Sequence, residues 1–215
     1  MEVIGGLHRT LVAGRRGHVL AEHLAALLPP RAKVLDVGCG DGVIDHLVSQ
    51  QRADVTIQGI DVFVRQDTQV PVEEFDGISI PYPDASFDTV MFVDVLHHTR
   101  NPFALLREGQ RVAKTIVIKD HFRNGILAKT SLRFMDWVGN AHHGVALPYN
   151  YWSRSEWSAA FEAAHLEVSD IKTSLGLYPR PASWIFERSL HFVARLGRGE
   201  VPRPISLWSE GAEKT

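Results

Sequence analysis

The fold is decided by residues 34–42, whose sequence is Val-Leu-Asp-Val-Gly-Cys-Gly-Asp-Gly. A short apolar strand, predicted at 33–37, runs directly into three glycines, and apolar residues resume at helical spacing from Val43. Glycine adopts positive φ and lets the backbone approach a ligand closely. Because open α/β sheets bind ligands at the carboxyl ends of their strands, this strand-to-helix turn is predicted to line a binding site.

The glycine spacing argues against phosphate binding. A dinucleotide fingerprint would need glycine at the position of Val43, and the Gly-Lys-Ser/Thr of a P-loop is absent from the turn. Asp61 lies 23 residues beyond Gly38, at the end of a second predicted strand (55–60), where a carboxylate can accept hydrogen bonds from two ribose hydroxyls. In the alternative interpretation, the glycines only make a tight turn and Asp61 only caps a loop.

Strands and helices alternate along the rest of the chain, which implies a parallel sheet with right-handed crossovers. Asn101-Pro102 offers a helix N-cap and a first-turn proline, and Ser153 with Glu156 forms a capping box for a helix reaching about residue 164. The other predicted helices cover residues 18–28 and the segment after Val43, and the other predicted strands cover 89–95, 115–118, 166–173 and 184–187.

Four motifs follow one another in an order that resembles the class I S-adenosylmethionine-dependent methyltransferases. The resemblance is to the small-molecule group that includes the quinone-biosynthesis C-methyltransferases, and it covers roughly residues 31–120. Its motifs are 34–42, Asp61-Val62, the segment 76–88 (Asp-Gly-Ile-Ser-Ile-Pro-Tyr-Pro-Asp-Ala-Ser-Phe-Asp) and the segment 93–98 (Val-Asp-Val-Leu-His-His). The chain departs from the family at 111–118, where the usual Lys-Pro-Gly-Gly-type turn is missing.

The resemblance implies an α/β fold: a doubly wound, mostly parallel seven-stranded sheet with helices on both faces. It divides a single domain over residues 1–198 into an N-terminal lid or helix (1–30), a cofactor-binding half (31–120), an acceptor cap (121–165) and the last strands (166–198), followed by a polar tail (199–215).

The resemblance also implies S-adenosylmethionine as cofactor and S-adenosylhomocysteine as product. Asp61 would hold the ribose, Asp76 would accept the adenine amino group, and Val62 and the Gly77 backbone would flank the adenine ring. The other residues expected at the cofactor, most of them at its amino-acid end, are Asp36, Gly38, Cys39, Gly40, Asp94 and Val95.

Candidate general bases follow the fourth and fifth strands. A sulfonium already carries a good leaving group, so alignment of the acceptor supplies much of the barrier reduction and no fixed triad is expected. His97 and His121 are the candidate bases, since histidine is the usual base near neutral pH. In the alternative, the adjacent histidines are structural. Tyr151, Trp152 and His98 are expected at the acceptor, whereas Trp157 is expected in the core.

The composition limits the kinds of partner that the protein is expected to bind. The 215 residues carry a net charge of −2, which gives no whole-molecule case for nucleic acid or an anionic membrane. Residues 1–98 hold 7 basic and 14 acidic side chains, and residues 99–215 hold 16 and 11, so an acidic acceptor is slightly favoured over a cationic one. A single cysteine, no signal peptide and no apolar membrane span lead us to expect a cytoplasmic protein.

The expected function is transfer of a methyl group to oxygen, nitrogen or carbon of a small molecule. A metal is not expected, since His142-His143 lacks partners at ligand spacing. The main alternative is a non-catalytic cofactor-binding or scaffold protein that retains the fold. A nicotinamide-dependent oxidoreductase is disfavoured by the glycine spacing. A nucleic-acid methyltransferase is disfavoured because the chain lacks an Asn-Pro-Pro-Tyr/Phe-like tetrapeptide and a second cysteine.

Overall fold

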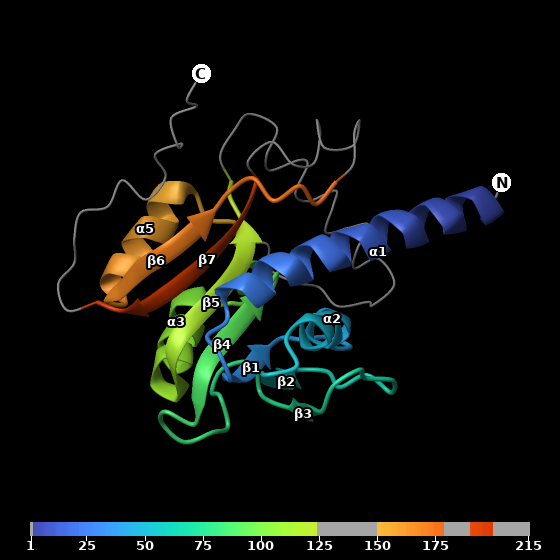
Figure 1. Cartoon of the computed structure of the whole chain (residues 1–215). Coiled ribbons are helices and arrows are strands. Elements are labelled where there is room, and N and C mark those ends of the chain that lie inside the picture. The colour runs from blue at the N-terminus through green and yellow to red at the C-terminus, as the bar shows by residue number, and fades with distance from the viewer. Residues whose placement is uncertain (1, 124–149, 179–189, 200–215) are drawn as a thin grey trace.

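A seven-stranded sheet forms the centre of the protein (Figure 1). The computed structural model describes residues 2–123, 150–178 and 190–199. The strand order is β3-β2-β1-β4-β5-β7-β6, and β7 runs antiparallel to both of its neighbours. The predicted α/β class and the mostly parallel sheet are therefore confirmed. The strands are β1 (Lys33–Val37), β2 (Thr56–Asp61), β3 (Val72–Glu74), β4 (Phe87–Val93), β5 (Ala113–His121), β6 (Leu166–Lys172) and β7 (His191–Arg198).

Both predicted helix starts are observed with their capping bonds. The Asn101 side chain accepts a hydrogen bond from the Ala104 amide (3.1 Å), with Pro102 in the first turn. Ser153 Oγ accepts from the Glu156 amide (3.2 Å), and the Glu156 carboxylate accepts from the Ser153 amide (2.6 Å). The helices are α1 (Glu2–Leu27), α2 (Val43–Gln51), the 3₁₀ turn η1 (Leu96–His98), α3 (Pro102–Val112) and α5 (Arg154–Ala163).

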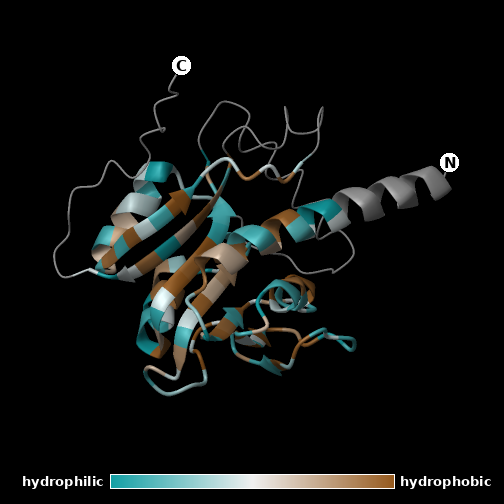
Figure 2. Ribbon diagram, viewed as in Figure 1, coloured by the Kyte–Doolittle hydropathy of each residue, from teal (hydrophilic) through white to brown (hydrophobic). Residues whose placement is uncertain are grey.

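The inner strands are covered on both faces. Side chains that are adjacent in sequence point to opposite faces of a strand, and here they enter two separate clusters. Leu35, Phe92 and Ile116 join the cluster that contains residues of α3 and α5. Val34, Met91 and Val117 join the cluster that contains residues of α1 and α2. Figure 2 shows the hydrophobic residues gathered on these strands, as burial of both faces of a parallel sheet requires.

Several predicted boundaries differ from the structure. The helix predicted at 18–28 begins already at Glu2, and the strand predicted at 115–118 extends over Ala113–His121. The three-residue strand β3 and the strand β7 were not predicted. The predicted strand at 184–187 and nearly all of the predicted tail lie outside the described residues. None of the described helices has the length and apolar character needed to span a bilayer.

Candidate functional site

The carboxyl ends of β1, β2, β4 and β5 meet along one edge of the sheet. The parallel register pairs Val37 with Ile60, and Val93 with Lys119. Residues that follow these strands are thereby brought together, where an open α/β sheet binds its ligand. A separate hollow of about 580 Å³ lies at the opposite edge, before β4 and β5 begin, and its lining includes Asp84, Arg111 and Arg198.

The glycine turn after β1 has the backbone that its sequence predicts. Gly38, Gly40 and Gly42 have φ of 80°, 64° and 72°. The Gly38 amide donates to the carbonyl oxygen of Ile60 (2.7 Å), which ties the turn to the end of β2. A Cβ on Gly38 would overlap Val95 Cγ2 and lie 3.0 Å from Val95 Cβ, so the two chain segments can approach this closely only with glycine at 38.

Replacing Gly38 by alanine is expected to destabilise the fold by more than the positive φ alone costs. The left-handed conformation costs a non-glycine residue roughly 1–2 kcal/mol, and the overlap with Val95 adds to that cost. Gly176→Ala is the matched control, because Gly176 has φ of 67° and a Cβ there would meet nothing within 4 Å. Urea unfolding should show the larger loss for Gly38→Ala and partial recovery when Val95→Ala is added. Equal losses at the two glycines would contradict the contact with Val95.

Asp61 connects the glycine turn to the loop after β2. Its Oδ2 accepts from the Gly40 amide (2.8 Å) and its Oδ1 accepts from the Phe63 amide (3.0 Å). An ionised carboxylate has about four acceptor positions, so each oxygen keeps capacity for one further donor. Asp61 can therefore stabilise the turn and still accept hydrogen bonds from a ligand with two hydroxyls.

Exposed apolar side chains gather beside Asp61. Val62 is 56% exposed, and Phe63 and Ile78 are also exposed. The Gly77 backbone, at φ of 77°, lies close to Val62: a Cβ added to Gly77 would be only 3.0 Å from Val62 Cγ1. Exposed apolar side chains that gather in one place are typical of a binding surface.

The Asp76 side chain is an ionised acceptor next to these apolar groups. Its Oδ1 accepts from the amides of Ser79 (2.8 Å) and Ile78 (2.7 Å). These bonds, with that from Ser79 the stronger influence, lower the pKa of Asp76. The carboxylate is thus suited to accept a hydrogen bond from an exocyclic amine.

Two carboxyl groups are buried beneath the glycine turn. Asp36 lies in β1 and Asp45 in the first turn of α2, and both are almost fully buried. Burial, followed by repulsion from Asp36 and then Asp45, raises the pKa of the neighbouring Cys39 thiol. Asp36 and Cys39 were predicted at the site, whereas Asp45 was not. The sequence held one signal for Asp45: it lies three residues before Val48 and therefore on the same buried face of α2.

Asp94 joins three elements through ion pairs. Its backbone has φ of 57°, and its amide donates to the Lys119 carbonyl (2.8 Å). Its carboxylate accepts from Arg16 of α1 (2.8 Å) and from the buried ammonium of Lys119. Burial opposes ionisation, yet Lys119, followed by His121 and Arg16, holds the pKa of Asp94 well below its usual range. Sequence analysis placed Asp94 at the site but did not single out Lys119.

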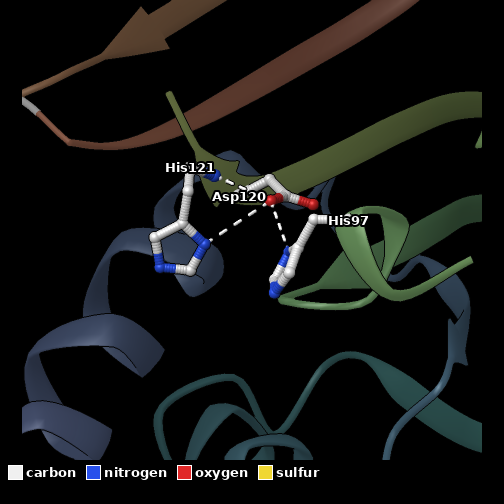
Figure 3. Close-up of side chains that lie close together, drawn as sticks. All are labelled: His97, Asp120 and His121. Atoms are coloured by element: carbon white, nitrogen blue, oxygen red, sulfur yellow. Dashed lines mark hydrogen bonds and ion pairs between the residues drawn. The ribbon is translucent and has the colours of Figure 1, made fainter. Parts of the chain in front are cut away.

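His97, Asp120 and His121 form a buried cluster (Figure 3). Asp120 Oδ1 lies 2.7 Å from His97 Nδ1 and also accepts from the His121 amide (2.7 Å). His121 Nδ1 lies 3.5 Å from the same oxygen and 3.4 Å from Asp94 Oδ1. The two histidines predicted as candidate bases are thus held beside one carboxylate.

The pKa shifts indicate the charges in this cluster. Burial opposes ionisation of Asp120, but His97 and the bond with His121 hold its pKa below the usual range. Burial, followed by the positive charge of Lys119, lowers the pKa of His121. Near neutral pH, Asp120 is therefore an anion and His121 a neutral imidazole.

Two of the three residues expected at the acceptor reach this cluster. The Tyr151 ring stacks on His97 with 5.3 Å between centroids, and the His98 ring lies 4.0 Å from that of His97. Trp152 instead contacts Trp157 (4.8 Å). Trp157 is buried, as predicted, and its indole N–H donates to the His121 carbonyl (3.1 Å).

His191 of β7 also lies beside this cluster, and the sequence analysis did not predict it. Its ring lies 4.7 Å from the ring of His121. His142 and His143 lie outside the described residues.

The same cluster has the donor set of a metal site. Ligand atoms of His97, Asp120 and His121 all lie within 4.8 Å of one another, an arrangement that the sequence did not predict. Two histidines and a carboxylate are common ligands of Zn²⁺ and Fe²⁺. The buried Lys119 ammonium, which already acts electrostatically on His121, opposes the addition of a divalent cation.

Comparison with known proteins places this chain among methyltransferases. A family model described as a methyltransferase domain matches residues 12–171. Over 111 residues the chain is 34% identical to 27-O-demethylrifamycin SV methyltransferase of Amycolatopsis mediterranei (strain S699), a match that covers 44% of this chain and 40% of that relative. The matched region is thus less than half of the relative's length.

Solved structures share the fold at low sequence identity. A putative methyltransferase in complex with the Haloferax volcanii Trm112 methyltransferase activator has a TM-score of 0.63 at 18% identity, over 89% of this chain and 93% of that chain. An S-adenosylmethionine-dependent methyltransferase from Mesorhizobium loti has a TM-score of 0.59 at 15% identity, over 82% and 96%. At these identities the likeness shows the fold alone.

Proposed function

This chain belongs to the methyltransferase-domain family, and from that premise we propose that it transfers a methyl group from S-adenosylmethionine to a small-molecule acceptor. The observation that carries the proposal is the bond from the Gly40 amide to Asp61, which joins the glycine turn to the acid of the second strand. Cofactor-binding residues of the family are thereby adjacent in space as well as correctly ordered in sequence.

The cofactor is proposed to lie along the carboxyl edge of the sheet, with Asp61 accepting from its ribose and Asp76 from its adenine amine. The free acceptor positions on Asp61 and the ionised state of Asp76 support these roles. Exposed Val62 beside Gly77 suits the adenine ring. The amino-acid end is assigned to Asp36, Gly38, Cys39 and Gly40, with Val95 and Asp94 beside it.

S-adenosylmethionine supplies an electrophilic methyl group on a positively charged sulfur. The protein then has to align the acceptor and, for a hydroxyl, remove its proton. His97 is proposed as the general base, because Asp120 engages its Nδ1 and thereby directs Nε2 toward the proton to be removed, the arrangement used by His–Asp pairs in hydrolases. His121 is the second candidate, since its imidazole is neutral and lies beside Asp94 and Asp120.

The acceptor is proposed to bind against Tyr151 and His98, whose rings lie 5.3 Å and 4.0 Å from the ring of His97. Trp152 is kept as a more distant contact, because it packs against Trp157. A base favours a hydroxyl or acidic-carbon acceptor over a neutral amine, because the proton of either acceptor has to be removed. Between the two, a hydroxyl is preferred, because the name of the Amycolatopsis relative specifies an oxygen atom.

Calorimetry with S-adenosylhomocysteine tests the cofactor assignment. Asp61→Ala is expected to weaken binding by about 100-fold or more, because two hydrogen bonds to a charged acceptor are lost. Asp67→Ala, which removes an exposed acid from the same loop, is the matched control and should bind normally. Absence of binding by the unmodified protein, or unchanged binding by Asp61→Ala, would contradict the proposal.

A panel of hydroxyl, amine and acidic-carbon acceptors tests the reaction. Mass spectrometry should detect a methylated product, and chelator-treated protein should remain active if His97 and His121 serve as bases and not as metal ligands. Cofactor binding without product from any acceptor class would favour the non-catalytic binding protein. Loss of activity with the chelator, restored by one divalent metal, would favour the metal site.

A further inference from the structure

Asp36 and Asp45 are buried carboxyl groups on either side of the glycine turn. They are 2% and 0% exposed and come from β1 and α2. Each carboxyl group shifts the pKa of the other. Asp36 Oδ1 and both carboxylate oxygens of Asp45 have no hydrogen-bond donor among the described residues.

The chemistry of this pair requires a proton. Two ionised carboxylates are acceptors only, so they cannot bond to each other unless one of them carries a proton. A buried acceptor without a donor is costly, and two adjacent negative charges away from water are costlier still. One shared proton removes both penalties, as it does in the carboxyl dyads of aspartic proteases.

The surroundings of the pair are acidic. Burial first, and then repulsion from Asp45 and Asp61, raises the pKa of Asp36 well above its usual range. Burial first, and then repulsion from Asp41, raises the pKa of Asp45. The Cys39 thiol beside the pair is kept protonated by burial and by these acids. Arg65, which lies over Gly40, pairs with Asp41 (3.2 Å) at the surface.

We propose that Asp36 and Asp45 share one proton in the free protein and release it when the cationic amino-acid end of the cofactor binds. Asp45, which is fully buried, thereby acts on the cofactor through Asp36. The inference rests on the proposed cofactor, whose ammonium group supplies the positive charge that replaces the proton. The carboxyl pair holds its proton more tightly in the ligand-free protein than in the complex, so the affinity for the cofactor rises with pH. The affinity stops rising at the pH where the pair is already ionised in the ligand-free protein.

Proton release is measured by titrating S-adenosylhomocysteine calorimetrically in phosphate and in imidazole, whose ionisation enthalpies differ. The unmodified protein is expected to release about one proton per ligand below neutral pH, with affinity falling about tenfold per pH unit as the pH decreases. Asp45→Asn should abolish both effects, because its amide donates permanently to Asp36. Asp67→Asn, which removes the charge of an exposed acid in the loop after β2, is the control and should leave proton release intact.

Three outcomes would separate the two proposals. Absence of S-adenosylhomocysteine binding would overturn the proposed function. Normal binding with a buffer-independent enthalpy, or proton release retained in Asp45→Asn, would overturn the shared proton alone. Infrared difference spectroscopy of the unmodified protein checks the same point without any variant: the carbonyl band of a protonated carboxylic acid, identified by labelled aspartate, should disappear when the ligand is added, and a persisting band would contradict the proposal.

Discussion

His97→Gln is expected to lower kcat for methyl transfer to a hydroxyl acceptor by about 10²–10⁴-fold, the usual contribution of a positioned general base. Glutamine places a neutral amide near the position of His97 Nε2, so the basic nitrogen is removed with little change in side-chain volume, although the 2.7 Å contact of Nδ1 with Asp120 is lost. Initial rates with an acceptor from the panel, together with calorimetric binding of S-adenosylhomocysteine, measure the effect. Ligand affinity should be unchanged.

The control for this variant is His46→Gln, at an exposed histidine of α2 whose ring bonds to Gln50, and it should have the unmodified rate. Asp120→Asn should also lower kcat, because the imidazole loses its anionic partner. A normal rate in His97→Gln with a large loss in His121→Gln would assign the base to His121. Normal rates in both would show that alignment of the acceptor is sufficient.

Asp94→Asn is expected to destabilise the ligand-free protein by up to about 3–5 kcal/mol, because the buried Lys119 ammonium loses the partly exposed carboxylate that compensates it. Asparagine tolerates the left-handed φ of 57° at this position, so the change removes charge with little backbone strain. Lys119, which is fully buried, would lose the carboxylate that compensates its ammonium. Chemical unfolding monitored by circular dichroism measures the difference.

A surface ion pair provides the control for Asp94. Asp84 pairs with Arg111 at 3.0 Å but is 79% exposed, so Asp84→Asn should cost no more than about 1 kcal/mol. Adding Lys119→Met to Asp94→Asn should recover part of the loss, since the uncompensated charge is then removed. Equal destabilisation by Asp94→Asn and Asp84→Asn would contradict a role for buried charge.

The Asp94 ion pair also determines a pH dependence. Because the pKa of Asp94 is held well below its usual value in the folded state, its stabilisation is present above the unfolded pKa and is lost as the pH falls toward the folded one. The slope of stability against pH in the acid range should therefore be smaller in Asp94→Asn than in the unmodified protein.

Local features of the sequence determined much of the fold. β1 has the predicted bounds, α3 begins at the predicted proline, and α5 begins with its predicted capping box. The glycines after β1 have the predicted positive φ. Each of these features depends on residues within one or two turns of the chain, where propensity, capping and steric limits act directly.

The strand β7 shows where such local signals end. It lies between β5 and β6 and is antiparallel to both. Residues 191–194 are all buried, since helices cover both sides of the sheet there, so the side chains show none of the alternation that marks a half-exposed strand. The position of β7 in the sheet is determined by its pairing with β5 and β6 and not by a local sequence pattern.

The charges of the site were likewise decided by tertiary structure. The sequence by itself determined the glycine turn, the acids at strand ends and the histidines after them, because strand ends and turns are local. Only folding brought Arg16 to Asp94 across 78 positions, and His97 to Asp120 across 23. Asp45 became a partner of Asp36 because α2 packs back over β1. Ionisation depends on burial and on neighbouring charges, and both are set by packing between segments distant in the chain.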